Sequence, residues 1–355
     1  MKPARSIFRS ILAPSVALLL FPTLAPAQLG SYSITWDDFK DGFSATGPDA
    51  KWFYFAFGPY VGDDGIETTS NKGLKVVSSG TNSTTGLPAY VRTLGQETDP
   101  VDNPFGLPGG LDHVKWLAMA NHLATTGFPG FDAVHGRELR FDAWISGRSY
   151  GNEFHPFGSA VADPDDDVRL AASAMPTIDF ENFIVADFFF TNKRIYAIYE
   201  RLPFGRTVFN NYAAFTYAIP VGTRQPHQQH HVTVAYDRTA NVFRWLIDDQ
   251  EVFRVENPGR LLPSREHMII DHGGIEEDVE CRQRNVSLGM FTLLDGAYPG
   301  QAGLVQLSAA PGFYFDTATG MPVAQTFLDI LSLHNSRVWG AGGEINVRKV
   351  RVSSR

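Results

Sequence analysis

A three-stranded meander is the feature that most constrains the fold of this chain, and it occupies residues 230–255. Apolar residues alternate with polar or small ones on either side of a polar break at residues 237–241, which is the period-2 pattern of half-buried strands. A tight turn follows at Asp248 and Asp249, and Trp245 lies in the middle strand. Strands joined by turns this short pair antiparallel, so the meander predicts a β-sheet protein.

The first 27 residues have the pattern of a signal peptide. A basic start precedes an apolar stretch that prolines interrupt, and residues 25–27 read Ala-Pro-Ala, which has the small-x-small form of a cleavage site. We therefore expect residues 1–27 to be removed from a secreted or periplasmic protein. The rest, residues 28–355, is expected to be a single domain.

Composition excludes several classes of partner. The chain is 43% hydrophobic and 13% aromatic, which is ample for a large core, and its formal net charge is −8. An acidic chain without a basic cluster is not expected to bind nucleic acid or an anionic membrane. Cys281 is the single cysteine, so no intramolecular disulfide can form, and we interpret it as a structural thiol.

Short apolar segments separated by Gly, Pro, Asn and Asp turns recur along the chain, as expected for one large β domain. Besides the meander, strands are predicted at residues 31–39, 52–57, 73–78, 137–146, 177–190, 194–201, 212–219, 286–294 and 345–353. Residues 112–126 are predicted to form the one substantial helix, with Asp112 as N-cap and Gly127 just past its end. Two long insertions, residues 96–110 and 147–168, are predicted to cap one face or line a cleft.

Together these segments resemble a concanavalin A-like jelly roll. The resemblance rests on the Trp-Asp-Asp-Phe sequence at residues 36–39, the aromatic meander and a last strand that runs to the chain end. It implies an all-β jelly-roll sandwich with one helical insertion and long capping loops, in which the first and last strands pair. The meander is similar to that of laminarinase-type β-glucanases. Over its whole length after residue 27, the chain is similar to a family of exported jelly-roll proteins for which no activity is established.

Residues 177–181, Thr-Ile-Asp-Phe-Glu, resemble the Glu-x-Asp-x-Glu cleft strand of laminarinase-type enzymes. By that resemblance Asp179 takes the assisting position and Glu181 the acid/base position. Thr177 replaces the nucleophile, and its hydroxyl cannot form the same glycosyl ester, so a double-displacement glucanase is not expected. Asp179 and Glu181 remain candidates for a catalytic pair. The alternative is a salt bridge with a neighbouring arginine on an exposed sheet face.

Further candidates surround this strand. His155, in the second insertion, is a candidate for an additional proton-transfer group, because its pKa can approach neutrality. Asp187 interrupts an apolar strand, and a carboxylate in such a place is either paired or functional. Five side chains are candidates for ligand contacts, the alternative being core aromatic residues with an ion pair: Tyr196, Tyr199, Glu200, Arg201 and Trp245.

No cofactor is expected and no metal ligands are assigned. Asp163, Asp165 and Asp167 have the spacing of a calcium loop, but Val168 stands where such a loop needs glycine. We interpret them as a solvated acidic loop and leave structural calcium open as the alternative. The histidines at residues 227–231 precede a strand, where residues three apart face opposite sides, so they do not form a zinc motif.

Three functions are compatible with the sequence. The first is an exported carbohydrate-active protein, either a glycoside hydrolase or a polysaccharide lyase that uses an Asp/Glu pair. The second is a non-catalytic glycan-binding module. The third is a pocket enzyme, an isomerase or cyclase, that acts on a small apolar metabolite. The expected partner is accordingly a carbohydrate or small-molecule ligand.

Overall fold

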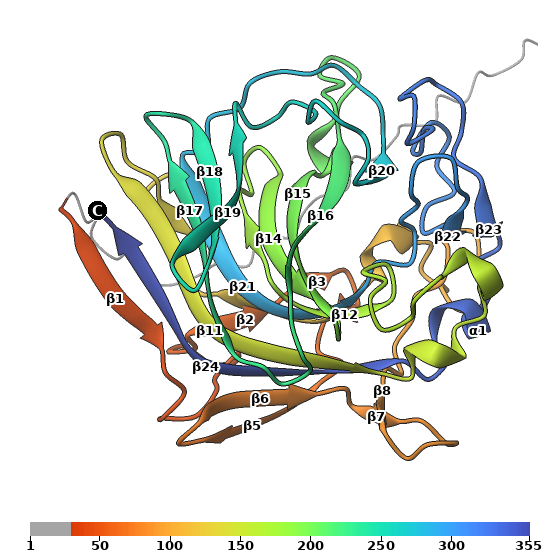
Figure 1. Ribbon diagram of the computed structural model, residues 1–355, viewed down its shortest axis with the longest axis horizontal. Coiled ribbons are helices and arrows are strands. Elements are labelled where there is room, and N and C mark those ends of the chain that lie inside the picture. Colours follow the sequence, from red (N-terminus) through yellow and green to blue (C-terminus); the bar gives the residue numbers. More distant parts are fainter. Residues whose placement is uncertain (1–29) are drawn as a thin grey trace, which may run out of the picture.

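The computed structural model describes residues 30–355, and the signal peptide predicted for residues 1–27 lies outside them. Two large antiparallel sheets pack face to face, and loops extend from their edges (Figure 1). The prediction of an all-β jelly-roll sandwich is confirmed. Within the described part of the chain, no helix has the length and apolar character needed to cross a bilayer.

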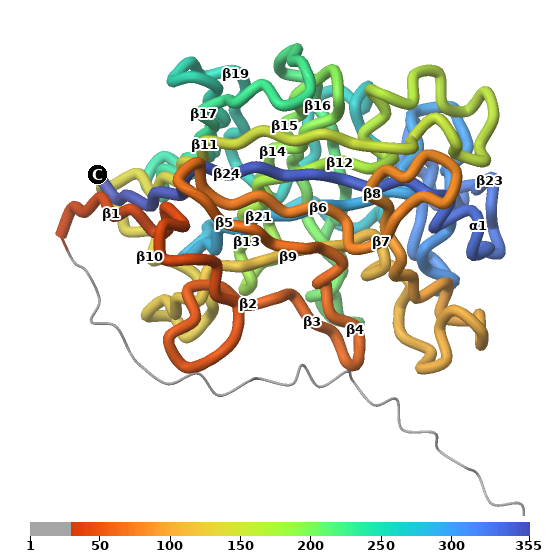
Figure 2. The backbone as a smooth tube through the Cα atoms, turned by 90° about the horizontal axis from the view of Figure 1, so that it is seen from below, coloured from red at the N-terminus to blue at the C-terminus, as the bar shows by residue number. Residues whose placement is uncertain are grey.

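The eight-stranded sheet has the order β19-β18-β17-β11-β24-β6-β5, and β1 also pairs with β24. Seen from below, β5, β6, β24 and β11 run side by side (Figure 2). The predicted pairing of first and last strands is confirmed, with Ile34 opposite Val352. The bounds of its strands are β1 Tyr32–Asp37, β5 Ile66–Ser70, β6 Gly73–Val77, β11 Glu138–Tyr150, β17 His230–Asp237, β18 Val242–Ile247, β19 Gln250–Glu256 and β24 Gly342–Ser354.

The ten-stranded sheet has the order β2-β9-β21-β12-β14-β15-β16-β20, with the short strands β10 and β13 beside β21. The bounds of its strands are β2 Trp52–Tyr54, β9 Val114–Ala120, β10 Phe131–Asp132, β12 Ala171–Met175, β13 Thr177–Ile178, β14 Ile184–Phe190, β15 Arg194–Arg201, β16 Phe215–Thr223, β20 Met268–Asp271 and β21 Gln283–Thr292. The remaining elements are β3 Ala56–Phe57, β4 Tyr60–Val61, β7 Gly80–Thr81, β8 Pro88–Ala89, β22 Gly303–Val305, β23 Phe327–Asp329, α1 His334–Arg337 and the 3₁₀ turns η1 Gly109–Leu111, η2 Asn152–Phe154, η3 Gly158–Ala160 and η4 Pro203–Gly205.

The helix predicted at residues 112–126 is wrong, because this segment contains strand β9. Trp116 packs in the core between the sheets, and its neighbour Leu117 packs in a second cluster on the other side. A strand buried on both faces is a continuous apolar run, which periodicity cannot distinguish from a buried helix. In the described residues the one α-helix is the four-residue α1.

A main core fills the space between the sheets. Trp245 on β18 is fully buried in it, and its Nε1 donates a hydrogen bond to the backbone oxygen of Asp187 on β14, 2.8 Å away. Because an unpaired indole N–H would be costly in a dry core, this bond fixes the position of the meander over the centre of the ten-stranded sheet.

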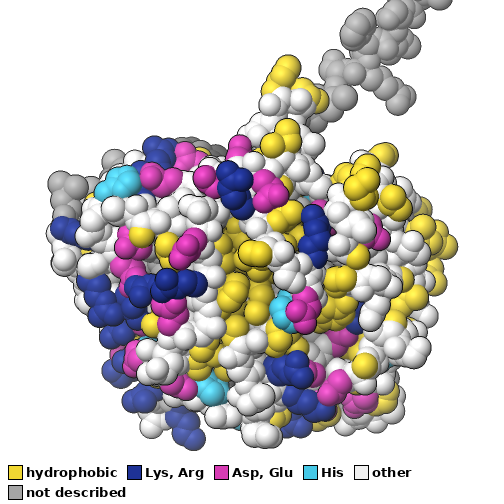
Figure 3. All heavy atoms as spheres, turned by 45° about the horizontal axis from the view of Figure 1, so that its top comes forward, with side chains coloured by type: hydrophobic (Ala, Val, Ile, Leu, Met, Phe, Trp, Pro, Cys, Tyr) yellow, Lys and Arg dark blue, Asp and Glu magenta, His cyan; other side chains and the backbone are white. Residues whose placement is uncertain are grey.

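A second apolar cluster covers the outer face of the ten-stranded sheet, which is the face turned away from the main core. Phe189, Ile198 and Phe291 belong to it, and Tyr314 and Phe327 pack onto them. The last two come from residues 293–333, here called the cover segment, which includes β22 and β23 at the right of Figure 1. When the top of the molecule is turned forward, hydrophobic side chains form a band across the surface, with charged side chains on both sides of it (Figure 3).

A buried ionic network joins α1, which follows the cover segment, to the sheet. The side chains of Asp112, Lys115 and Arg337 are fully buried, and the Asp112 carboxylate contacts both cations. It also accepts a hydrogen bond from the Thr93 hydroxyl at 2.6 Å. The cations hold the pKa of Asp112 below its ordinary value against the opposing effect of burial. Asp112, expected to cap a helix, therefore connects β9 to α1.

Replacement of Asp112 by Asn should be strongly destabilising, because Lys115 and Arg337 would stay buried without a compensating charge. We expect the free energy of unfolding in urea to fall by about 3–5 kcal/mol. The matched control is Asp163→Asn, which breaks a 2.7 Å pair with Lys193 between half-exposed side chains. That change should cost less than about 1 kcal/mol. Equal losses in the two variants would contradict this account of the network.

Candidate functional site

Two neighbouring carboxyl groups lie on the outer face of the ten-stranded sheet. In the pairing of β14 with β15, Val185 lies opposite Glu200 and Asp187 lies opposite Ile198. Ile198 belongs to the outer cluster, and residues two apart on a strand share a face. Asp187 and Glu200 are therefore diagonal neighbours on that face. Asp187 is 5% exposed, and Glu200 is partly exposed.

A break in the neighbouring strands orients the Asp187 side chain. Pro176 separates β12 from β13. Between these two strands, hydrogen bonds that involve side chains take the place of the backbone hydrogen bonds to β14. The Thr177 N–H donates to Asp187 Oδ1 at 2.7 Å, and the Thr177 hydroxyl donates to the Ala186 oxygen at 2.6 Å. Thr177 is thus a structural partner of Asp187.

Burial sets the charge state of the pair. It raises the pKa of Asp187 well above its ordinary value, and the Glu200 charge raises it further, against the opposing effect of the Thr177 N–H. Burial also raises the pKa of Glu200 to about 7, although the Thr216 hydroxyl donates to its Oε1. Burial therefore favours the protonated form of Asp187, and Glu200 is near its midpoint at neutral pH. Since Asp187 Oδ1 accepts a hydrogen bond, we place the proton on Oδ2.

A third acid belongs to the same environment. Burial raises the pKa of Asp295, in the cover segment, to about 6, and its charge contributes to the raised pKa of Glu200. The Tyr314 hydroxyl donates to Asp295 Oδ2 at 3.1 Å. His272 lies against the ring of Tyr314, and burial lowers the pKa of this histidine to about 4, so it is neutral at pH 7.

The motif at residues 177–181 does not form a pair of free carboxylates. Asp179 is fully buried, and its Oδ1 accepts hydrogen bonds from the Glu181 backbone N–H at 2.8 Å and the Gln283 amide at 2.7 Å. Its Oδ2 accepts one from Asn182 at 3.0 Å. Glu181 forms an ion pair with Arg282 at the surface. The alternative stated above, a carboxylate paired with an arginine, describes Glu181 in this structure. The catalytic role of Asp179 and Glu181 stays a prediction that the geometry does not favour.

His155 contacts neither carboxyl of that motif nor Asp187 or Glu200. It follows η2, its Nδ1 accepts a hydrogen bond from the Phe157 N–H at 3.1 Å, and its ring stacks on Phe157. Burial lowers its pKa. None of these four carboxyl groups is therefore in contact with His155, and its role in proton transfer stays a prediction.

The candidate ligand residues divide between several environments. Trp245 and Tyr199 are fully buried in the main core, so neither ring can stack on a ligand here, and the alternative of core aromatics applies to both. Tyr196 lies on the outer face, but the acidic loop covers it and its hydroxyl donates to the Asp166 backbone oxygen. Arg201 is buried, stacks over a tyrosine ring and pairs with a glutamate. Glu200 alone of the five lies beside Asp187.

The acidic loop has its own partners. Asp163 pairs with Lys193, Asp165 accepts a hydrogen bond from the Asn192 amide, and Asp167 pairs with Arg169. Over residues 30–355, no group of three or more His, Cys, Asp or Glu side chains is arranged to hold a metal ion. Cys281 is fully buried, and burial raises the pKa of its thiol well above the ordinary value, in accord with a structural role.

Comparison with known proteins identifies relatives of unknown function. The model of a family described as a family of unknown function, DUF6081, matches residues 36–355. A relative, Uncharacterized protein L829 of Acanthamoeba polyphaga mimivirus, is 28% identical over 250 residues. That match covers 54% of this chain and 56% of the relative, so the chain spans about half the length of the curated relative it matches.

Two solved structures that contain carbohydrate ligands resemble this chain with low TM-scores. A Crh5 transglycosylase in complex with NAG is 12% identical, with a TM-score of 0.38 over 91% of this chain and 83% of that chain. The κ-carrageenase of Pseudoalteromonas carrageenovora, in complex with an oligotetrasaccharide of κ-carrageenan, is 12% identical, with a TM-score of 0.35 over 94% and 100% of the two chains. At these values the similarity carries no argument about activity.

Replacement of Glu200 by Gln should stabilise the protein at alkaline pH. The pKa of Glu200 rises from 4.5 to about 7 on folding. Its contribution to stability is therefore fully present below pH 4.5 and is lost as the pH rises through 7. We expect Glu200→Gln to raise the free energy of unfolding at pH 8 by about 2 kcal/mol, after a discount for partial exposure, and to change it little at pH 4. Urea unfolding at both pH values measures this. The exposed Glu256→Gln is the control, and a gain that does not depend on pH would contradict the assignment.

Proposed function

We propose that this chain, which belongs to the family DUF6081, is an exported carbohydrate-active enzyme that hydrolyses a glycosidic bond with Asp187 and Glu200. The observation that carries the proposal is the difference between these two adjacent acids. Asp187 is almost fully buried, and burial raises its pKa well above the ordinary value, whereas its diagonal neighbour Glu200 is partly exposed and has its pKa raised to about 7. Neighbouring acids with separated pKa values are the arrangement that general acid–base catalysis requires.

In this proposal Asp187 is the general acid and Glu200 the general base. The proton on Asp187 Oδ2 passes to the glycosidic oxygen as the bond between that oxygen and the anomeric carbon breaks. Glu200 takes a proton from the water molecule that attacks the anomeric carbon. The backbone positions of diagonal cross-strand neighbours are about 7–8 Å apart, which is compatible with the carboxyl separation of about 6.5–9.5 Å that inverting enzymes use. Inversion of the anomeric configuration is therefore the proposed outcome.

The surroundings favour a neutral substrate. The ionised forms of Glu200 and Asp295 and a net charge of −8 would repel a polyanionic glycan. Phe313 is partly exposed at the edge of the outer cluster and offers apolar ring surface on this side of the molecule. Aromatic rings beside a few polar groups suit the alternating apolar and hydroxyl faces of a sugar. A non-catalytic glycan-binding module would need no acid whose pKa is raised to about 7, so this feature supports the enzyme over the module.

Removal of either acid should abolish catalysis. We expect Asp187→Asn and Glu200→Gln each to lower kcat by about 10²–10⁴-fold, measured as release of reducing ends from a panel of neutral polysaccharides. Activity of the wild-type protein should rise with pH through about 7, because Glu200 must be ionised to act as the base. The Glu256→Gln variant, altered at an exposed site on β19, should keep full activity.

A further variant tests whether Asp187 and Glu200, or the motif residues Asp179 and Glu181, carry the activity. Glu181→Gln removes the surface ion pair with Arg282 and leaves the outer face of the sheet intact. Activity lost in Glu181→Gln and retained in Glu200→Gln would reject the Asp187–Glu200 assignment in favour of the motif. A Glu200 pKa near 4.5, measured by carbon-13 NMR titration of the side-chain carboxyl, would reject the acid–base proposal whether or not a substrate is found.

A further inference from the structure

A pocket lies where the two sheets end side by side. β5 is the last strand of the eight-stranded sheet, and β2 is the last strand of the ten-stranded sheet. Residues from both strands line a pocket of about 450 Å³, a size that suits a small organic molecule. We call it the edge pocket. Its lining consists of residues 42–46, in the loop before β2, together with Tyr54, Glu67 and Thr69.

Glu67 on β5 is held by donors from the opposite sheet. Its Oε1 accepts a hydrogen bond from the Tyr54 hydroxyl at 2.6 Å and another from the Trp116 indole N–H at 2.7 Å. Tyr54 belongs to β2, and the fully buried Trp116 belongs to β9. Burial and the hydrogen bond to Glu67 raise the pKa of Tyr54, so its hydroxyl stays a donor. The two bonds fix the orientation of the Glu67 carboxylate.

The other oxygen of this carboxylate is left for a ligand. In the part of the chain that the structure describes, Glu67 Oε2 accepts no hydrogen bond, and no cationic side chain pairs with the carboxylate. A carboxylate that keeps one oxygen without a partner can accept a hydrogen bond from a cation, and such charge-assisted bonds are the strong ones. The pocket therefore favours a ligand that is both positively charged and a hydrogen-bond donor.

Aromatic rings in the same lining favour the same charge. The rings of Phe43 and Tyr54 are half-buried, with centroids 6.3 Å apart, and Phe43 also packs on Trp116 at 5.9 Å. The Trp52 N–H donates to the Ser44 oxygen at 3.1 Å, which holds the loop that carries Phe43. Because the face of an aromatic ring attracts cations, the rings and the carboxylate select one kind of ligand.

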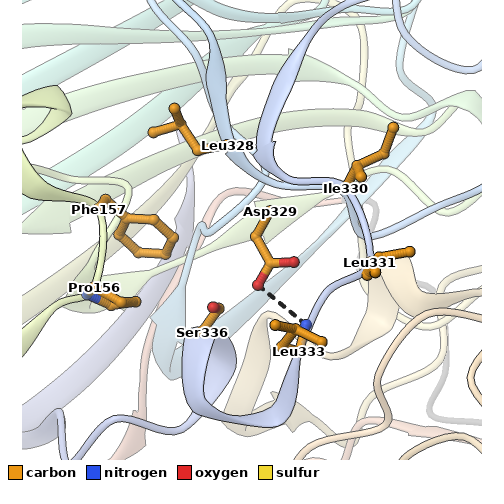
Figure 4. A pocket seen from close by; sticks show the side chains of 8 residues that line it. All are labelled: Pro156, Phe157, Leu328, Asp329, Ile330, Leu331, Leu333 and Ser336. Atoms are coloured by element: carbon orange, nitrogen blue, oxygen red, sulfur yellow. Dashed lines mark hydrogen bonds between the residues drawn. The ribbon is translucent and has the colours of Figure 1, made fainter.

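A hollow of about 460 Å³ beside β23 and α1 differs from the edge pocket in this respect (Figure 4). Its carboxylate, Asp329, accepts the N–H of Leu333 at 3.0 Å, so a turn within the same loop accounts for its position. Most of its other side chains are aliphatic, such as Leu328 and Ile330. Both donors to Glu67 come from the opposite sheet, and no local turn accounts for that carboxylate.

We propose that the edge pocket binds a primary ammonium group carried on a small organic molecule. The ammonium donates to Glu67 Oε2, and the carbon atoms next to it lie against the ring of Phe43. A primary ammonium has three N–H donors, and the exposed hydroxyl groups of Ser44 and Thr69 offer further acceptors in the lining. Strands β9, β21 and β12 separate β2 from the strand of Asp187, so this site is distinct from the proposed catalytic pair.

Two matched pairs of ligands test the proposal on the wild-type protein. D-Glucosamine differs from D-glucose, and benzylamine from benzyl alcohol, by an amino group in place of a hydroxyl, and at about pH 6 both amines are protonated. The indole N–H signal of Trp116 in proton–nitrogen NMR reports binding, because this group contacts Glu67. At least one ammonium ligand should shift it, and its neutral partner should bind about tenfold more weakly or worse. Binding of glucosamine alone assigns the site to amino sugars, and binding of benzylamine alone assigns it to simple amines.

Glu67→Gln removes the charge and keeps an oxygen for Tyr54 and Trp116. This variant should lose the preference for the ammonium ligand over its neutral partner, and the exposed Glu256→Gln on β19 should retain it. The proposal is overturned if neither ammonium ligand shifts the Trp116 signal at about 20 mM, or if charged and neutral partners bind equally. A preference that survives in Glu67→Gln would overturn it as well. The ligand comparison uses the wild-type protein, so it does not depend on the stability of the variant.

Discussion

The hydrogen bond from the Trp245 indole to the backbone oxygen of Asp187 ties the meander to the centre of the ten-stranded sheet. The donor is in the core and the acceptor is a strand carbonyl, so the bond leaves little freedom for β14 to slide or rotate under β18. Once the Asp187 backbone is fixed, strand geometry turns its side chain to the outer face. The placement of the candidate acid thus follows from a contact made on the opposite side of the sheet.

The outer face combines two properties that oppose one another energetically. Its apolar cluster stabilises the cover segment, but the same burial makes ionisation of Asp187, Glu200 and Asp295 unfavourable. A purely structural surface would be more stable with neutral side chains at these positions. Proteins retain such groups mainly where their protonation is used, and this is the physical reason to look for chemistry here and not at the paired carboxylates of residues 179–181.

Much of the fold could be predicted from sequence because alternation is a local signal. The meander, the strand at residues 194–201 and the pairing of the first and last strands all follow the expected pattern. The sequence could not show that the helix predicted at residues 112–126 is wrong. Both faces of β9 are buried, so apolar and polar residues do not alternate along it. The cover segment was not predicted either, since its position depends on distant partners, such as Glu97 for the Ser308 hydroxyl.

The candidate site was only partly accessible from sequence. Asp187 stood out as a carboxylate in an apolar strand, and Glu200 was among the expected ligand contacts, but nothing local joined them. Their proximity depends on the register of β14 and β15, which the turn at Thr191 and Asn192 sets. The motif at residues 177–181 carried a clearer sequence signal, yet the bond from Gln283 to Asp179 and the ion pair of Arg282 with Glu181 come from residues about 100 positions away.

The position of β24 has a consequence for how the molecule acquires its structure. This strand, residues 342–354, has β11 and β6 as its neighbours and also pairs with β1, so it lies in the interior of its sheet. On a ribosome, β1, β6 and β11 emerge long before it and wait with unsatisfied edges. Such edges attract other strands. Productive folding is therefore expected to be slow, because the sheet cannot be completed before β24 is available, and the nascent chain depends on whatever shields those edges until then.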